Sequence, residues 1–302
     1  MRKYGVLTFA KFQKEFYEKL ENDGFKIYYK IPNPPEMIDI LVVRSKTLVN
    51  RDLVHQLPNL QCVITATHGK DHVDEFYLLE RGIQFYTTPV QSEDVAQGVM
   101  GYVFAHATRL LEGDRSMKQS QWNKKKLIGV RIQGKTLGII GYGKIGKYVE
   151  QLAQALKMKV VIYDPYVKKT TVSFPQLLEI SDYITIHVPL NEETRCMIGE
   201  VEISQMKDGA YLINTARGEI IDERALLKAL NEGKLSGAGL DVYKKQPPFN
   251  DDVTKQLIEH PKVIATPHSI GQTIEALQEK GESVIKIIKR ELETSKKHLK
   301  RY

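Results

Sequence analysis

Cysteine is scarce in this chain, which has only Cys62 and Cys196 among its 302 residues. Two cysteines cannot form the disulfide framework of a small secreted domain, and they fit a reducing compartment. No apolar run in the sequence is long enough to cross a membrane. Lysines interrupt the first apolar stretch, where a signal peptide would need an unbroken one. We therefore expect a cytoplasmic protein with no membrane partner.

A concentrated basic patch is also missing, although the chain is basic overall. Lys and Arg number 44 against 37 Asp and Glu, which leaves a formal net charge of +7. The lysines stand in short, dispersed groups with no nucleic-acid-binding motif around them. We interpret them as solvated surface that weakly attracts anionic ligands, and we expect no nucleic-acid partner.

Short apolar runs alternate with amphipathic runs along the whole chain, and 302 residues are enough for two domains. Such alternation is typical of α/β proteins with parallel sheets. The expected strands cover residues 4–7, 38–43, 61–66, 136–140, 160–163, 183–188, 210–214 and 263–265. The expected helices cover residues 12–22, 174–180, 222–231 and 272–300, in addition to two discussed below.

The most informative motif is a glycine-rich turn between an expected strand and an expected helix. Its glycines are Gly141, Gly143 and Gly146. The first permits a tight turn, the second lets a pyrophosphate approach the backbone, and the third lets the helix pack on the strand. The helix begins at Lys144 and Ile145, where free N–H groups and the positive end of the helix dipole favour an anion. This is the fingerprint of a dinucleotide site.

Asp164 ends the next expected strand, where a carboxylate can accept hydrogen bonds from the adenosine ribose hydroxyls. The same carboxylate would repel a 2′-phosphate, so we expect NAD as the cofactor. Lys168 and Lys169 follow closely and could soften that preference. The helix between the turn and this strand has one apolar stripe that we expect to pack on the sheet, made of Ile145, Val149, Leu152 and Leu156.

A second long helix is predicted from Ser92, its N-cap, to Glu112, with Gly113 as its stop. It is apolar over most of its circumference. Such a helix must be covered, either by its own domains or by a second subunit. We expect a homodimer built on this helix.

Several segments end or follow expected strands and are therefore candidates for binding ligands, since strand ends of a parallel sheet converge on one crevice. They cover residues 44–47, 67–74, 187–190, 214–218, 237–242 and 266–271. His68 and His72 could bind zinc if they lay on a helix. Gly69 indicates a loop there, and no third ligand is evident, so we expect no metal.

Jointly these motifs resemble the D-isomer-specific 2-hydroxyacid dehydrogenase family, which includes phosphoglycerate dehydrogenases and glyoxylate reductases. The matching segments are the glycine turn with Asp164, the loop with Gly69, Asp71, Val73 and Asp74, the motif around Arg217, Leu240-Asp241-Val242, and Thr266-Pro267-His268. The resemblance implies an α/β protein with two parallel-sheet domains. A flavodoxin-like substrate (catalytic) domain, residues 1–94 and 271–302, would enclose an inserted NAD-binding Rossmann domain, residues 95–270.

The resemblance also implies a 2-oxoacid or 2-hydroxyacid substrate and a set of site residues. Arg217, a permanently charged fork, would hold the substrate carboxylate and polarise the carbonyl. His268 would exchange a proton with the carbonyl oxygen during hydride transfer, whereas His106 and His187 are better interpreted as buried structural histidines. Asp241 resembles the family residue that contacts the nicotinamide carboxamide.

Two sets of ligand contacts follow. The cofactor-binding set is Gly141, Gly143, Lys144, Ile145, Gly146, Asp164, His187, Val188, Pro189, Thr194, Thr215, Ala216, Arg217, Asp241, His268 and Gly271. The substrate-binding set is Ser45, Lys46, His68, Gly69, Lys70, Arg217 and His268.

Gln246 is a departure from the family, which usually has a Glu at this place, paired with the catalytic His. A carboxylate would favour the imidazolium of His268, and a neutral amide cannot, although it can still orient the ring. We therefore take Gln246 as the third catalytic residue and expect reduction to be shifted toward acid pH. Formate dehydrogenases resemble this chain in having Gln here, but the rest of their pattern is not evident.

Two other functions stay open. One is a dehydrogenase of a phosphorylated hydroxyacid, because residues 71–74 resemble erythronate-4-phosphate dehydrogenases, and Lys46, Lys70 and His72 could bind a phosphate. The other is a non-catalytic NAD(H)-sensing protein of the corepressor kind, which shares this fold.

Overall fold

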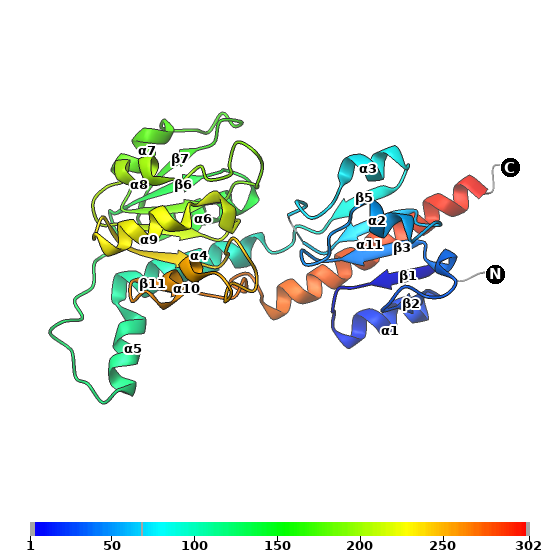
Figure 1. Cartoon of the computed structure of the whole chain (residues 1–302), viewed down its shortest axis with the longest axis horizontal. Helices are drawn as coiled ribbons and strands as arrows, with labels where there is room; N and C mark the ends of the chain where they lie inside the picture. Colours follow the sequence, from blue (N-terminus) through cyan, green and yellow to red (C-terminus); the bar gives the residue numbers. More distant parts are fainter. Residues whose placement is uncertain (1–3, 68, 300–302) are drawn as a thin grey trace. The chain divides into compact units, whose positions relative to one another are not determined.

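The computed structural model describes residues 4–67 and 69–299, which divide into two compact units. Unit 1 comprises the chain up to Gln91 and from Gln272 onward, and unit 2 is Ser92–Gly271 (Figure 1). Because the chain leaves unit 1 and later returns to it, unit 2 is an insertion. No helix in the described ranges is long and apolar enough to cross a membrane.

Unit 1 is built on a five-stranded parallel sheet in the order β2-β1-β3-β4-β5. This flavodoxin-like order places a topological switch point between β1 and β3. Its elements are β1 (Gly5–Thr8), α1 (Lys14–Asn22), β2 (Lys26–Tyr28), η1 (Pro35–Met37), β3 (Ile40–Val43), α2 (Arg51–His55), β4 (Cys62–Thr65), α3 (Glu75–Glu80), β5 (Gln84–Thr87) and α11 (Ile274–Leu299).

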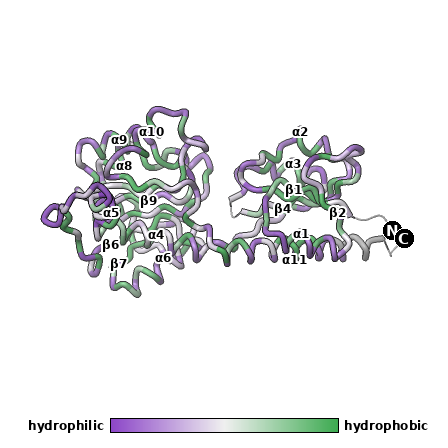
Figure 2. Tube along the Cα trace, turned by 90° about the horizontal axis from the view of Figure 1, so that it is seen from below, coloured by the Kyte–Doolittle hydropathy of each residue, from purple (hydrophilic) through white to green (hydrophobic). Residues whose placement is uncertain are grey.

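Both faces of the unit 1 sheet are covered, which explains why β3 and β4 are continuously apolar rather than alternating. Val42 faces α1 and α11, where Val284 and Ile288 complete the cluster. Leu41 and Val43 face the opposite side, with α2 and α3. The amphipathic pattern of α11 is visible in Figure 2 as green alternating with purple along the helix.

Unit 2 is built on a six-stranded parallel sheet in the order β11-β10-β9-β8-β6-β7. The switch point lies between β6 and β8. Its elements are α4 (Ser92–Thr108), α5 (Leu110–Lys118), β6 (Thr136–Ile140), α6 (Lys144–Ala155), β7 (Lys159–Tyr163), α7 (Phe174–Ile180), β8 (Tyr183–Ile186), α8 (Glu200–Gln205), β9 (Ala210–Asn214), η2 (Gly218–Ile220), α9 (Glu223–Asn231), β10 (Leu235–Leu240), α10 (Asp252–Glu259) and β11 (Val263–Ala265). These topologies confirm the expected fold class of two parallel-sheet α/β domains.

Consecutive residues of the unit 2 strands enter different cores on the two faces of the sheet. Ile139 packs with α4 and α6, while Ile140 packs with α7, α8 and α9. Tyr211 and Leu212 divide in the same way along β9. Burial on both faces leaves only the strand ends available for ligands.

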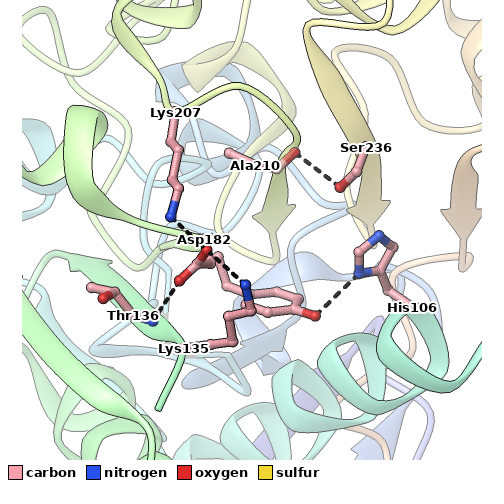
Figure 3. A network of polar contacts seen from close by, with 8 residues as sticks. His106, Lys135, Thr136, Asp182, Lys207, Ala210 and Ser236 are labelled. Atoms are coloured by element: carbon pink, nitrogen blue, oxygen red, sulfur yellow. Dashed lines mark hydrogen bonds and ion pairs between the residues drawn. The ribbon is translucent and has the colours of Figure 1, made fainter. Parts of the chain in front are cut away.

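The amino-terminal edge of this sheet is tied together by polar contacts (Figure 3). Asp182 accepts a hydrogen bond from Thr136 N–H at 2.8 Å. It also forms ion pairs with Lys207 at 2.8 Å and with Lys135 at 3.3 Å. Burial opposes ionisation of Asp182, but the bonds from Lys207 and Thr136 and the charge of Lys135 outweigh it and lower the pKa. The polar groups at this edge therefore stabilise the fold.

His106 is a structural histidine, as the sequence indicates. Its ring stacks on Tyr211 with centroids 4.1 Å apart. Its Nδ1 lies 3.3 Å from the Tyr183 hydroxyl, a contact that is dashed from His106 in Figure 3. Burial, with a smaller effect of Arg109, lowers the pKa of His106 to about 4, so the ring is neutral at physiological pH.

Two expectations about helices are wrong in part. The helix expected from Ser92 to Glu112 ends at Thr108, because Arg109 adopts a left-handed conformation with φ of 55° and α5 begins after it. On α6, Leu152 does not join the packed stripe and is 38% exposed. Glu150 is buried instead, at 7% exposed.

Candidate active site

The three glycines of the turn after β6 have the three different surroundings that the motif predicts. Gly141 has φ of +92°, and a Cβ there would lie 2.7 Å from the His187 carbonyl carbon. A Cβ on Gly146 would lie 2.4 Å from the Gly141 oxygen. A Cβ on Gly143 would meet no described atom within 4 Å. The turn is thus closely packed on its inner side and open at Gly143.

The amino terminus of α6 opens onto the same side. Gly143 is the N-cap of the helix, and the first helical bond runs from Lys147 N–H to the Gly143 carbonyl at 3.2 Å. The preceding N–H groups, on Lys144, Ile145 and Gly146, have no partner within the helix. They form the kind of anion site that helix amino termini provide.

Asp164 follows β7 and lies beside this turn. Its Oδ2 accepts a hydrogen bond from Tyr142 N–H at 2.8 Å, and its Oδ1 accepts one from Tyr166 N–H at 3.0 Å. The carboxylate is only partly buried, so both oxygens keep lone pairs for a ligand. The structure therefore brings the acidic residue and the glycine turn together.

Two buried polar atoms lack a partner in the described structure at the ends of adjacent strands. Nδ1 of His187, after β8, is one, and its Nε2 lies 2.9 Å from the Thr185 hydroxyl. Burial lowers the pKa of His187 to about 3, so the ring is neutral, as expected of a structural histidine. The other is Oγ1 of Thr215, after β9. Such atoms are rarely left unsatisfied, and a ligand with hydrogen-bonding groups would satisfy them.

The loop that follows β8 is held by its own side chains. Thr194 Oγ1 donates to the Pro189 carbonyl at 2.6 Å and accepts from Asn191 N–H at 2.9 Å. The hydroxyl of Thr194 is thus used to close the loop that begins at Val188 and Pro189. Thr194 would therefore contribute to a ligand site by fixing the position of this loop, and not through its hydroxyl.

Arg217 is placed by a buried amide that the sequence reasoning did not select. Asn214, at 1% exposed, accepts from Ala216 N–H at 3.0 Å and donates to the Arg217 carbonyl at 2.8 Å. Arg217 Nη1 donates to the Ala216 carbonyl at 2.8 Å. The next residue, Gly218, packs so closely on Tyr243 that a Cβ would lie 2.0 Å from the Tyr243 carbonyl carbon. The Arg217 segment therefore lies against the segment that follows β10.

Asp241 fixes the segment that carries His268. It is 2% exposed, and its Oδ1 accepts hydrogen bonds from the Thr266 hydroxyl, from Ser269 N–H at 2.8 Å and from Ile270 N–H at 3.2 Å. These donors stand on both sides of His268, which has a left-handed φ of 56°. The contact with nicotinamide expected of Asp241 stays a prediction, because the described bonds of its carboxylate serve this segment.

Tyr102 on α4 is linked to Asp241 through the Thr266 hydroxyl. Its hydroxyl lies 2.6 Å from Thr266 Oγ1. Because Thr266 donates its hydrogen to Asp241, Tyr102 must be the donor to Thr266. Sequence reasoning missed this link, since no local pattern connects residues 102 and 266. Gly271, which ends the segment, would place a Cβ 2.5 Å from Val95 Cγ2, so it serves close packing.

Gln246 and His268 are brought together, with Gln246 Oε1 and His268 Nδ1 2.9 Å apart. An amide oxygen only accepts, so Nδ1 carries the hydrogen. In the neutral ring, Nε2 is then the nitrogen with acceptor character. This pair follows β10 and β11, at the same sheet edge as Arg217.

The candidate residues of unit 1 follow β3 and β4. Ser45 and Lys46 are exposed, and Lys70 forms an exposed ion pair with Glu75 at 2.9 Å. Gly69 is held by its carbonyl, which accepts from the Thr67 hydroxyl at 2.8 Å. His68 lies outside the described residues.

His72, the other histidine considered as a possible zinc ligand, does not lie on a helix. It is 6% exposed, and its Nε2 lies 2.9 Å from the Thr65 hydroxyl. Within residues 4–67 and 69–299, no group of three or more His, Cys, Asp or Glu could hold a metal ion.

Arg44, at the end of β3, was not singled out from the sequence. Its side chain is half-buried, and burial lowers the pKa of the guanidinium. No carboxylate among the described residues pairs with it. A partly desolvated cation of this kind favours an anionic ligand.

Comparison with known proteins agrees with this geometry. The profile described as "D-isomer specific 2-hydroxyacid dehydrogenase, NAD binding domain" matches residues 100–269. Hydroxypyruvate reductase of Thermotoga maritima is 40% identical over 261 residues, covering 84% of this chain and 85% of that protein. D-3-phosphoglycerate dehydrogenase of Methanocaldococcus jannaschii is 38% identical over 264 residues, but this chain spans only about half of its length, 50%.

A solved structure is similar over almost the whole chain. D-lactate dehydrogenase from Aquifex aeolicus, complexed with NAD and lactic acid, has a TM-score of 0.87 at 31% identity and covers 98% of this chain and 97% of its own. The open glycine turn, the helix terminus and the unsatisfied polar atoms fit a dinucleotide. The chain belongs to the D-isomer-specific 2-hydroxyacid dehydrogenase family and is an NAD-dependent oxidoreductase.

Proposed function

We propose that this protein interconverts a D-2-hydroxyacid and its 2-oxoacid, with Arg217, His268 and Gln246 acting on the substrate. The observation that carries the proposal is the pairing of His268 Nδ1 with Gln246 Oε1 at 2.9 Å, on the sheet edge that also presents Arg217 and the glycine turn. That edge joins a fixed cation and a proton donor, the two groups that a 2-oxoacid needs.

Unit 2, residues 92–271, would act as the NAD-binding domain that the sequence predicts at residues 95–270. Unit 1 would act as the substrate domain predicted at residues 1–94 and 271–302. The amino terminus of α6 would hold the pyrophosphate and Asp164 the ribose hydroxyls. His187 Nδ1 and Thr215 Oγ1 would gain partners. The remaining contacts would come from Val188, Pro189, Thr194, Ala216, Asp241 and Gly271. When bound, NADH supplies the hydride.

The residues of this chain would then divide the work. Arg217 holds the substrate carboxylate with its planar fork and draws electron density from the neighbouring carbonyl. In reduction, protonated His268 donates its Nε2 hydrogen to the carbonyl oxygen, and in oxidation neutral Nε2 accepts it back. Gln246 keeps the hydrogen on Nδ1 throughout, which presents Nε2 for this exchange.

In unit 1, backbone N–H groups near Ser45 and Gly69 would bind the substrate, with Lys46 and Lys70 nearby. A phosphorylated hydroxyacid is a second candidate substrate, favoured by Arg44. That half-buried guanidinium pairs with no described carboxylate, so a substrate phosphate could take that place. The phosphoglycerate dehydrogenases among the relatives agree with this candidate.

A homodimer is the proposed assembly. The apolar residues of α4 are mostly buried inside unit 2, but the expected 92–112 segment leaves Phe104 41%, Leu110 61% and Leu111 41% exposed. Met117, in the rest of α5, is 59% exposed. A second copy that covers these side chains would remove this apolar surface from water.

Sedimentation equilibrium tests the dimer. We expect twice the chain mass of 34.5 kDa for the wild type and a monomer for the double variant Phe104→Glu/Leu111→Glu, because buried charges would disrupt the interface. Phe76→Glu, at a residue that is 74% exposed in unit 1, is the control and should stay dimeric. A wild-type mass of one chain would contradict the proposal.

Gly143→Ala tests the cofactor site. A methyl group at this position meets nothing in the protein within 4 Å, so the thermal midpoint should not fall. It would occupy the space of the pyrophosphate, and we expect NADH affinity to drop about tenfold or more. Isothermal titration calorimetry gives the measurement. Gly101→Ala, where a Cβ is equally unobstructed, is the control; equal NADH affinity in both variants would rule out this cradle.

NADH oxidation with glyoxylate, hydroxypyruvate, pyruvate and 3-phosphohydroxypyruvate tests the reaction. We expect turnover of at least one acid, and about a 100-fold or larger loss of kcat in His268→Gln, with a much smaller change in NADH affinity. Arg217→Met should lose at least about 100-fold in kcat/KM, because it loses the carboxylate contact. His260→Gln, at the opposite sheet edge, is the control. NADH binding without turnover of any acid would sink the proposal.

Gln246→Glu tests the pairing with His268. A carboxylate beside the ring would stabilise the imidazolium and raise the pKa of His268, so the acid form would persist to higher pH. Reduction should therefore extend upward by about one pH unit. Gln246→Leu is the control and should lose rate without moving the profile. An unmoved profile in Gln246→Glu would show that the pair does not set the pH dependence.

A further inference from the structure

Glu150 is a buried carboxylate on the helix that follows the glycine turn. It is 7% exposed and accepts hydrogen bonds from the Tyr142 hydroxyl and from Gln154 Nε2, the latter at 3.1 Å. Lys169 Nζ lies 3.0 Å from its Oε1 and 3.2 Å from its Oε2. Burial opposes ionisation of Glu150, but the bonds from Tyr142 and Lys169 outweigh it and lower the pKa. Glu150 and Lys169 are therefore a charged pair.

Lys169 is held close to Asp164 by its neighbour in the chain. The Thr170 hydroxyl bonds to both the N–H and the carbonyl of Asp164, the former at 3.0 Å. The Lys169 side chain is 55% exposed, so solvent alone would let it swing freely. Its ammonium instead sits against Glu150 and over the Tyr142 ring, 5.4 Å from the centroid.

Tyr142 connects this pair to the cofactor turn. Its N–H donates to Asp164 Oδ2 at 2.8 Å, while its hydroxyl donates to Glu150. The contacts thus form a closed ring through Asp164, Tyr142, Glu150, Lys169 and Thr170. Within that ring, the negative charge of Asp164 has no cation bonded to it, whereas the positive charge of Lys169 is compensated by Glu150.

That charge distribution matters for the choice between NADH and NADPH. The two differ by a 2′-phosphate on the ribose, which carries close to two negative charges at neutral pH. Asp164 repels such a group, and only a nearby uncompensated cation could offset the repulsion. Lys169 has the right charge and follows Asp164 by five residues, with Thr170 bonded to Asp164. Its pairing keeps it from that use.

We propose that Glu150 is a positioning residue for cofactor selectivity, which holds Lys169 in an ion pair, withholds that cation from a 2′-phosphate, and so favours NADH over NADPH. The inference rests on the proposed role of the glycine turn and Asp164. Glu150 acts through Lys169 and needs no contact with the cofactor itself.

Glu150→Gln tests the inference in the full-length protein. The amide keeps the shape, its oxygen can still accept from Gln154 Nε2, and its NH2 group can donate to the Tyr142 hydroxyl. The loss of the carboxylate charge releases the charge of Lys169. We expect the Kd ratio of NADPH to NADH, measured by calorimetry, to fall about fivefold, with NADH affinity changed less than twofold. The kcat/KM ratio should move in parallel. Glu179→Gln, an exposed residue on α7, makes the same charge change and should leave the ratio unaltered.

The double variant Glu150→Met/Lys169→Met covers the case in which Glu150→Gln does not fold. Replacing a buried pair by apolar groups of similar size is often tolerated. If Glu150 compensates the charge of Lys169 in the wild type, removing both residues should leave the Kd ratio of NADPH to NADH within twofold of the wild-type value. A fivefold rise in the Kd ratio of NADPH to NADH would show that Lys169 already binds the 2′-phosphate in the wild type, and it would overturn the inference.

A folded Glu150→Gln protein whose ratio falls less than threefold would also overturn it. Failure of the cofactor site itself looks different, because wild-type protein would then bind neither NADH nor NADPH. If wild-type protein binds NADH and only the ratio fails to move, the cofactor site stands and the role of Glu150 is wrong.

Discussion

Close backbone packing at the carboxyl edge of the unit 2 sheet is the constraint on which the rest of the site depends. The Gly141 backbone touches that of His187, Gly146 touches Gly141, and Gly218 touches Tyr243, all nearer than any side chain would allow. Each strand end is thereby locked to its neighbour. The helix terminus, the unsatisfied polar atoms and the Arg217 segment are consequently held in one frame.

Buried polar side chains form the next level of this frame. Asn214 and Asp241, at 1% and 2% exposed, would be costly to bury without partners. Asn214 forms hydrogen bonds with the backbone at and beside Arg217, and Asp241 forms hydrogen bonds with the backbone that follows His268. Arg217 and His268 are the candidate catalytic residues. The left-handed φ of His268 is tolerable because Asp241 holds the segment on both sides. Stability and catalytic geometry therefore depend on the same bonds.

Gln246 shows how a neutral group can replace a charged one in such a frame. The amide oxygen orients the imidazole of His268 as a carboxylate would, at 2.9 Å. It adds no negative charge, so orientation and electrostatic stabilisation of the imidazolium are separated in this chain. Position and charge are separated at Lys169 too. The residue follows Asp164 closely in the chain, but its charge is compensated by Glu150.

Local features of the sequence were sufficient for the fold class, the glycine turn and the strand ends that carry polar residues. These depend on residue spacing and on backbone conformations that glycine alone adopts easily, and both are set by near neighbours in the chain. The break at Arg109 was not evident, because an arginine in the left-handed region has no local signature. The sequence does not predict the short strands β2 and β5 for a similar reason, since three or four residues give little periodicity.

By itself, the sequence determined which residue types stand at the carboxyl ends of the strands and hence the family and its cofactor. Only the tertiary structure decided what each polar group binds. Helical periodicity predicted Leu152 inside, yet Glu150 is buried because Tyr142 and Lys169 arrive from other segments to satisfy it. The physical reason is that a chain's local conformation follows from adjacent residues, whereas the partner of a buried charge comes from residues far along the sequence.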